Sequence, residues 1–139
     1  MFIDAYDYKV VIGEPAFKVV TQADPDNRAN AEAEAIEEMS GYLRPKYDCG
    51  KIFAAEGDAR NRQVLMYACD IALYHMASSL PQRMGIDIRE KRYEKALDWL
   101  KKVQEGVILP DLPLALDDQG NTAAPTIRYG SEPCVDNSY

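Results

Sequence analysis

The side chains that could do chemistry in this chain are few and widely spaced. The single histidine, His75, lies in the most apolar stretch, residues 64–77, and Cys69 lies six residues before it. Six residues correspond to about 120° around a helix, so the two side chains do not converge on one metal ion or one thiolate. A lone histidine in such a stretch is more often a satisfied core or interface residue than a general base, and Cys69 is most simply a small buried apolar residue.

Motifs for catalysis or cofactor binding are absent. The chain has no glycine-rich phosphate loop, no His-Glu-x-x-His, no Gly-x-Ser-x-Gly and no Cys-x-x-Cys. Glu34, Glu37 and Glu38 lie on a similar side of a predicted helix, but no Glu-x-x-His motif completes a metal site, so a solvated acidic face is expected. Residues 117–121 place oxygens as a calcium loop does but lack its closing glutamate, which favours a polar turn. We expect no catalytic residue, no metal site and no cofactor, and therefore no enzyme.

Asp70 lies inside the apolar stretch, where an unpaired carboxylate would cost several kcal/mol to bury. On a helical projection it shares a side with Gln63, Tyr67 and Tyr74. We interpret Asp70 as a buried anchor that accepts hydrogen bonds from a tyrosine or from Arg92. The alternative role, a catalytic acid, has no partner base in the sequence.

Composition limits the classes of function. The chain has 139 residues, of which 47% are hydrophobic and 28% charged, as in one compact domain. Its net charge of −7 argues against nucleic-acid binding and against attraction to anionic lipid. Three widely spaced cysteines, Cys49, Cys69 and Cys134, form no disulfide framework, and the N-terminal residues do not resemble a signal peptide. We expect a protein made in a reducing cytoplasm, without a membrane span.

Three segments carry helical periodicity. The first is predicted at residues 25–44, with Asp24 as N-cap and an apolar stripe listed in order as Ala29, Ala33, Ile36, Met39 and Leu43, with Ala35 and Tyr42 alongside. The second, residues 58–79, is apolar nearly all round, which is typical of a central helix covered by its neighbours. The third, residues 88–105, is predicted to begin with an Asp87 and Glu90 capping box and to end at Gly106.

The two ends of the chain are less regular. Residues 1–22 combine a β-branched run with Gly13 and Pro15, and either a short strand or a short helix is compatible with them. Residues 110–139 contain four prolines and no helical period, although residues 126–129 could pair as a strand. The predicted fold is mainly α: a small bundle of three main helices plus a short N-terminal element, residues 1–109, followed by an extended C-terminal arm, residues 110–139.

Aromatic residues indicate protein contacts. Trp99 falls at the border of its helix's apolar stripe, so it is either a lid on the core or an interface anchor. Nine tyrosines, including Tyr129 and Tyr139 in the arm, favour protein–protein contact. A helical body without a catalytic constellation, followed by an arm, is typical of an assembly component. We take Asp70, Arg92, Tyr74, Trp99 and Tyr129 as the structural or interface candidates.

The chain also resembles a known family. MYACDIALYHM, IREKRYEKALDWLKKVQEG with PDLP, AEAIEEMSGYLRPKYD and, in the tail, IRYGSEP resemble the small neck proteins of tailed bacteriophages and Mu-like prophages. That family, long listed as a domain of unknown function, is similar to helical head–tail connector (adaptor) proteins. The resemblance covers residues 27–113 well and the ends loosely. Its motifs are packing signatures: Asp70 and Arg92 match polar positions, and Leu73, Tyr74, Tyr93 and Trp99 match apolar ones.

The resemblance implies a structural role in the virion neck. It implies that a helical body assembles as a homo-oligomeric, dodecameric ring beneath the portal protein and above tail or stopper proteins. It also implies a terminal arm that reaches the portal or a neighbouring subunit. An acidic ring would let DNA pass through its lumen without specific binding. Two alternatives remain: a tail-completion protein, and a small helical regulatory module that binds another protein through the edge at Trp99.

Overall fold

The computed structural model describes residues 2–21, 25–78 and 86–115. Among them are six α-helices, listed in order as α1 (Ala5–Ile12), α2 (Glu14–Thr21), α3 (Pro25–Leu43), α4 (Cys49–Ala54), α5 (Arg62–Ser78) and α6 (Ile86–Glu105). A single 3-10 turn, Gly57–Ala59, precedes α5. The described residues form no strand, and the predicted mainly helical fold is confirmed.

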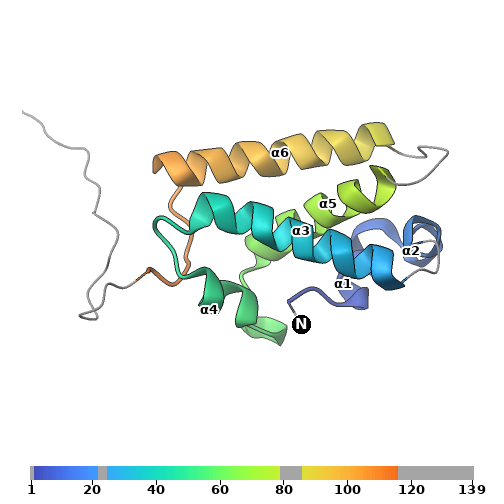
Figure 1. Ribbon diagram of the computed structural model, residues 1–139, viewed down its shortest axis with the longest axis horizontal. Helices are drawn as coiled ribbons and strands as arrows, with labels where there is room; N and C mark the ends of the chain where they lie inside the picture. Colours follow the sequence, from blue (N-terminus) through green and yellow to red (C-terminus); the bar gives the residue numbers. More distant parts are fainter. Residues whose placement is uncertain (1, 22–24, 79–85, 116–139) are drawn as a thin grey trace, which may run out of the picture.

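The central helix is α5. It contacts α3, α6, α1 and α2, and α3 also packs on α6 (Figure 1). Ten of its residues are buried, as its apolar sequence predicted. The core joins residues from every α-helix, with Tyr8, Met39, Leu73 and Leu100 fully enclosed.

The N-terminal element is a pair of helices, which resolves the open choice between strand and helix. The Asp4 side chain accepts hydrogen bonds from the Tyr6 and Asp7 amides, and the Asp7 side chain accepts one from the Asp4 amide. This capping box starts α1 and outweighs the β-branched run that follows. Gly13, at φ 83°, ends α1 in a conformation that favours glycine, and α2 begins at the next residue.

Two predicted helix starts need correction, and one further helix was not predicted. The second helix begins at Arg62 rather than at residue 58, because the Asn61 side chain accepts hydrogen bonds from the Gln63 and Val64 amides and so caps it. The third begins at Ile86, which places Asp87 inside the helix and not at its cap. Helix α4, capped by Asp48, was not predicted. The predicted cap Asp24 lies outside the described residues.

The buried side of α3 also differs from the predicted stripe. Ala35, Met39 and Leu43 are buried as predicted, but Ala29 and Ala33 are exposed and Ala31, which was outside the predicted stripe, is buried instead. Alanines occur on both sides of this helix and each is only weakly apolar, so the packing of α3 on α5 and α6 decides which side is covered.

The chain after α6 stays on the helical body for several residues. Leu112 is buried, the Asp48 amide donates to the Pro113 carbonyl over 2.9 Å, and the Ala115 amide donates to the Lys46 carbonyl over 3.1 Å. These bonds flank an isolated antiparallel bridge between Tyr47 and Leu114. Residues 110–115 are therefore part of the body. The predicted turn at 117–121 and strand at 126–129 lie outside the described residues.

Candidate functional site

Asp70 and Arg92 join α5 to α6. Asp70 is 3% exposed, and its Oδ1 accepts a hydrogen bond of 2.7 Å from Arg92 Nε. The contact expected from the sequence is therefore present. Burial raises the pKa of Asp70 above its ordinary value, although Arg92 opposes this shift. Nearby, burial and the charge of Arg92 lower the pKa of Arg89, whose Nη1 is buried without a hydrogen-bond partner among the described residues.

A second polar cluster joins all three long helices. Glu38 of α3 meets His75 of α5 through Oε1 at 3.1 Å, and its Oε2 accepts a 2.6 Å hydrogen bond from the Tyr93 hydroxyl of α6. Tyr93 also stacks on Tyr74, with ring centroids 4.2 Å apart. Burial, followed by the bond to Glu38, raises the pKa of Tyr93. Glu38 therefore belongs to the helix contacts, and its predicted place on a solvated acidic face is wrong.

Glu32 is a further carboxylate that sequence reasoning missed. It is buried, and its Oε1 accepts hydrogen bonds from the Tyr8 hydroxyl at 2.8 Å and from Arg28 Nε at 2.7 Å. The Arg28 guanidinium lies over the Tyr8 and Phe17 rings, which stack on each other. Burial and the neighbouring Glu32 raise the pKa of Tyr8. The cluster fastens α1 and α2 to α3.

Trp99 belongs to the core. It is 4% exposed, and its ring lies 4.9 Å from the Tyr67 ring. Of the two predicted roles, the lid on the core fits this position, because an interface anchor would need an exposed ring. Tyr129, the remaining candidate, lies outside the described residues.

Cys69 is buried at 1% exposure, and burial raises the pKa of its thiol to about 12. It is therefore a thiol and not a thiolate at neutral pH. Within residues 2–21, 25–78 and 86–115, no group of three or more His, Cys, Asp or Glu side chains could hold a metal ion. No helix in the described part of the chain is long and apolar enough to cross a membrane.

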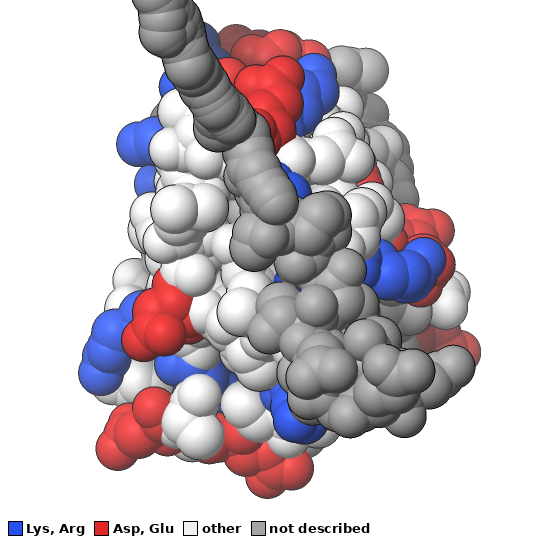
Figure 2. All heavy atoms as spheres, turned by 90° about the vertical axis from the view of Figure 1, so that its left-hand side faces the viewer, with Lys and Arg blue, Asp and Glu red and all other residues white. Residues whose placement is uncertain are grey.

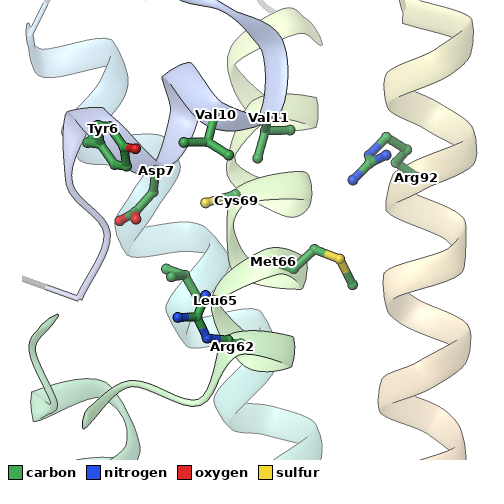
Figure 3. A pocket seen from close by; sticks show the side chains of 9 residues that line it. All are labelled: Tyr6, Asp7, Val10, Val11, Arg62, Leu65, Met66, Cys69 and Arg92. Atoms are coloured by element: carbon green, nitrogen blue, oxygen red, sulfur yellow. The ribbon is translucent and has the colours of Figure 1, made fainter. Parts of the chain in front are cut away.

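A groove opens on α5 between α1 and α6, and sequence reasoning did not predict it (Figure 3). Its volume is about 590 Å³. The residues that line it are Tyr6, Asp7, Val10, Val11, Arg62, Leu65, Met66, Cys69 and Arg92. Most of these side chains are apolar, and we call this surface the α1–α6 groove.

The charges beside the groove are unevenly paired. Asp7 is held by Arg60, with Nη1 2.6 Å from Oδ2, and Asp70 is held by Arg92. Arg62 is exposed and makes no ion pair with another described residue. The groove is therefore an apolar surface with a cation at its rim, and it suits an apolar partner that carries a carboxylate.

A second apolar surface lies at the end of the bundle where α6 stops. Val107 and Leu109 are 71% and 78% exposed, and Asp111 beside them is also exposed. Figure 2 looks onto this end, where uncharged residues occupy much of the visible middle and most Lys, Arg, Asp and Glu side chains lie toward the edges. We call residues 107–111 the ridge.

The geometry thus consists of polar clusters that fasten helices and two outward apolar surfaces. Comparison with known proteins gives the lineage. Residues 5–128 match the family described as Bacteriophage Mu, Gp36. No curated protein and no solved structure matches the chain. Because the family match spans most of the 139 residues and agrees with the packing motifs noted in the sequence, the chain belongs to the Bacteriophage Mu Gp36 family.

Proposed function

We propose that this phage protein is a structural head–tail connector (adaptor) of the virion neck. In this role, copies of the chain form a dodecameric ring beneath the portal protein and above the tail or stopper proteins. DNA passes through the lumen without specific binding, and the chain performs no catalysis. The protein is made in the host cytoplasm and ends in the virion.

Besides the family match, one observation supports the proposal: the polar side chains bond inside the bundle, whereas apolar side chains are exposed on its surface. Asp70, Glu38 and Glu32 all make their hydrogen bonds inside the bundle. Among the exposed large apolar residues of the described chain, Tyr6, Val10 and Met66 line the groove and Val107 and Leu109 lie on the ridge, whereas Val19, Ile88 and Leu114 lie outside both. Such surfaces are typical of proteins that bind other proteins. The net charge of −7 is compatible with a lumen that repels phosphate.

The test is the fate of virions that lack the chain. Producing cells with a stop codon in its coding sequence are expected to accumulate DNA-filled heads and complete tails that are not joined, seen by negative-stain electron microscopy. Supplying the chain from a plasmid should restore joined particles. Normal infectious particles without the chain would contradict the proposal.

Mass spectrometry of the separated particles tests the position in the neck. We expect the chain and the portal protein together on heads purified from a tail-deficient mutant. Recovery of the chain on free tails alone would favour the tail-completion role. Recovery with one cellular protein and with no virion component would favour the regulatory module.

A further inference from the structure

The ridge is a short irregular segment with two different sides. Val107, Leu109 and Asp111 are exposed. The residues between them are half-buried, and Leu112 is buried. Gly106, at φ 84°, turns the chain out of α6, and its amide donates to the Val103 carbonyl. The segment is therefore fixed at both ends, and it presents two apolar side chains followed by a carboxylate.

The groove offers the complementary features. Tyr6, Val10 and Met66 are exposed at 72%, 67% and 37%, so apolar side chains line the open sides of the groove. Arg62 stands at the rim without an ion pair to another described residue. The volume of about 590 Å³ accommodates several apolar side chains. A partner that brings apolar groups and one carboxylate fits this surface.

We propose that the ridge of one copy of this chain docks in the α1–α6 groove of the next copy. Val107 and Leu109 pack against Val10 and Met66, and the Asp111 carboxylate binds the Arg62 guanidinium. Each contact buries apolar surface and pairs a cation that has no ion partner among the described residues.

This contact joins two different surfaces, so association is head-to-tail. A head-to-tail contact leaves one free ridge and one free groove after every addition, and it ends only when the rotation between copies closes a ring. The closed ring rests on the proposed connector function. The contact itself belongs to the isolated chain and is measured without the portal.

Sedimentation velocity of the full-length chain over a concentration series tests the contact. Leu109→Glu, on the ridge, and Val10→Glu, in the groove, are each expected to weaken self-association about 30-fold, the effect of losing a central interface residue. Val19→Glu, on α2 and 49% exposed, is the matched control and should associate like the wild type. Circular dichroism melts verify that all three variants fold.

Mixing the two defective variants gives the sharper result. Leu109→Glu keeps an intact groove and Val10→Glu keeps an intact ridge, so an equal mixture should form a one-to-one dimer that grows no further. An exchange of charges completes the set: Arg62→Glu and Asp111→Arg should each weaken association, and the double variant should restore it.

Three results would overturn the proposal: a wild-type chain that is monomeric at every concentration, ridge variants that associate normally, or a mixture that stays monomeric. Loss of association on removal of residues 116–139, with ridge variants unaffected, would assign the groove to that segment instead. A monomeric chain that is still found in virion necks would refute this contact alone. Self-association of a chain that is absent from virions would refute the connector function alone.

Discussion

Two sides of the same helix, α5, differ in how their side chains are used. Toward α3 and α6, Asp70 bonds to Arg92 and His75 meets Glu38. Toward the α1–α6 groove, Met66 stays partly exposed and Arg62 has no ion pair with another described residue. The polar residues that look chemically interesting in the sequence are thus engaged in holding the bundle. The surface left for partners is mainly apolar.

The largest loss of stability is expected when the ion pair between α5 and α6 is broken. Arg92→Met should lower the free energy of unfolding by about 3 kcal/mol, because the buried Asp70 carboxylate loses its hydrogen-bonded cation. The effect falls at the low end for a buried pair since the Arg92 side chain is 40% exposed. Urea unfolding at neutral pH measures it. Adding Asp70→Asn should recover most of the loss, and a double variant as unstable as the single one would contradict this interpretation.

The same variant has a pH signature. Because burial raises the folded-state pKa of Asp70 above its ordinary value, the folded protein holds this proton more tightly than the unfolded chain. Stability therefore falls as the pH rises between the unfolded and folded pKa values, and it levels off above them. Arg92 opposes the shift, so without it the fall in stability with rising pH should be larger than in the wild type. If the unfolding free energies of the wild type and of Arg92→Met depended on pH in the same way, this would argue against a buried Asp70 whose charged form Arg92 stabilises.

The second largest loss of stability is expected when the C-terminal part of the chain is removed. Removing residues 110–139 is expected to cost about 2 to 3 kcal/mol, because Leu112 loses its buried position and the Asp48 amide loses its acceptor. Removing only residues 116–139 leaves these contacts in place, so it is expected to cost less than the longer truncation. Chemical denaturation of both proteins measures the difference. Equal losses would place the end of the body elsewhere.

A single hydroxyl should matter less. Tyr93→Phe keeps the stack on Tyr74 but removes the 2.6 Å hydrogen bond to Glu38, so we expect a loss of about 1 kcal/mol. Tyr6→Phe, at a side chain that is 72% exposed, is the control and should leave the melting temperature unchanged. A similar drop in both variants would show that the Glu38 bond contributes nothing specific.

The smallest effect on stability is expected for a substitution on the exposed ridge. Leu109→Glu should change the free energy of unfolding by less than about 0.5 kcal/mol, since its side chain is 78% exposed. Thermal melts of dilute protein measure this without self-association. A large loss would mean that Leu109 supports the bundle, and the ridge would then belong to the packed interior rather than to the exposed surface.

The parts of this structure that could be predicted are those with a local cause. The apolar run of α5 predicts a central helix, and its lone Asp70 calls for a cation, which the next helix supplies as Arg92. Two further helix starts have local signals in the sequence that the predicted bounds did not include: Asn61, which caps α5, and the pair Asp4 and Asp7, which caps α1.

The parts that could not be predicted depend on contacts between distant segments. Glu32 is buried because Tyr8, 24 residues earlier, donates a hydrogen bond to it. The groove takes its walls from α1, α5 and α6, so no local pattern marks it. The ridge is too short for its alternation of exposed and less exposed side chains to be recognised in the sequence. Val107 and Leu109 are exposed because Leu112 is the residue that packs into the body.

The bridge between Tyr47 and Leu114 determines how a mechanical load would enter the molecule. Tension on the chain beyond Ala115 meets first the Ala115–Lys46 and Asp48–Pro113 backbone bonds, at the turn between α3 and α4. The end of α6 lies further back along the chain, so these two bonds carry part of the load before it reaches α6. The bridge therefore directs a force applied to the C-terminal part of the chain into the segment between α3 and α4 rather than straight into α6.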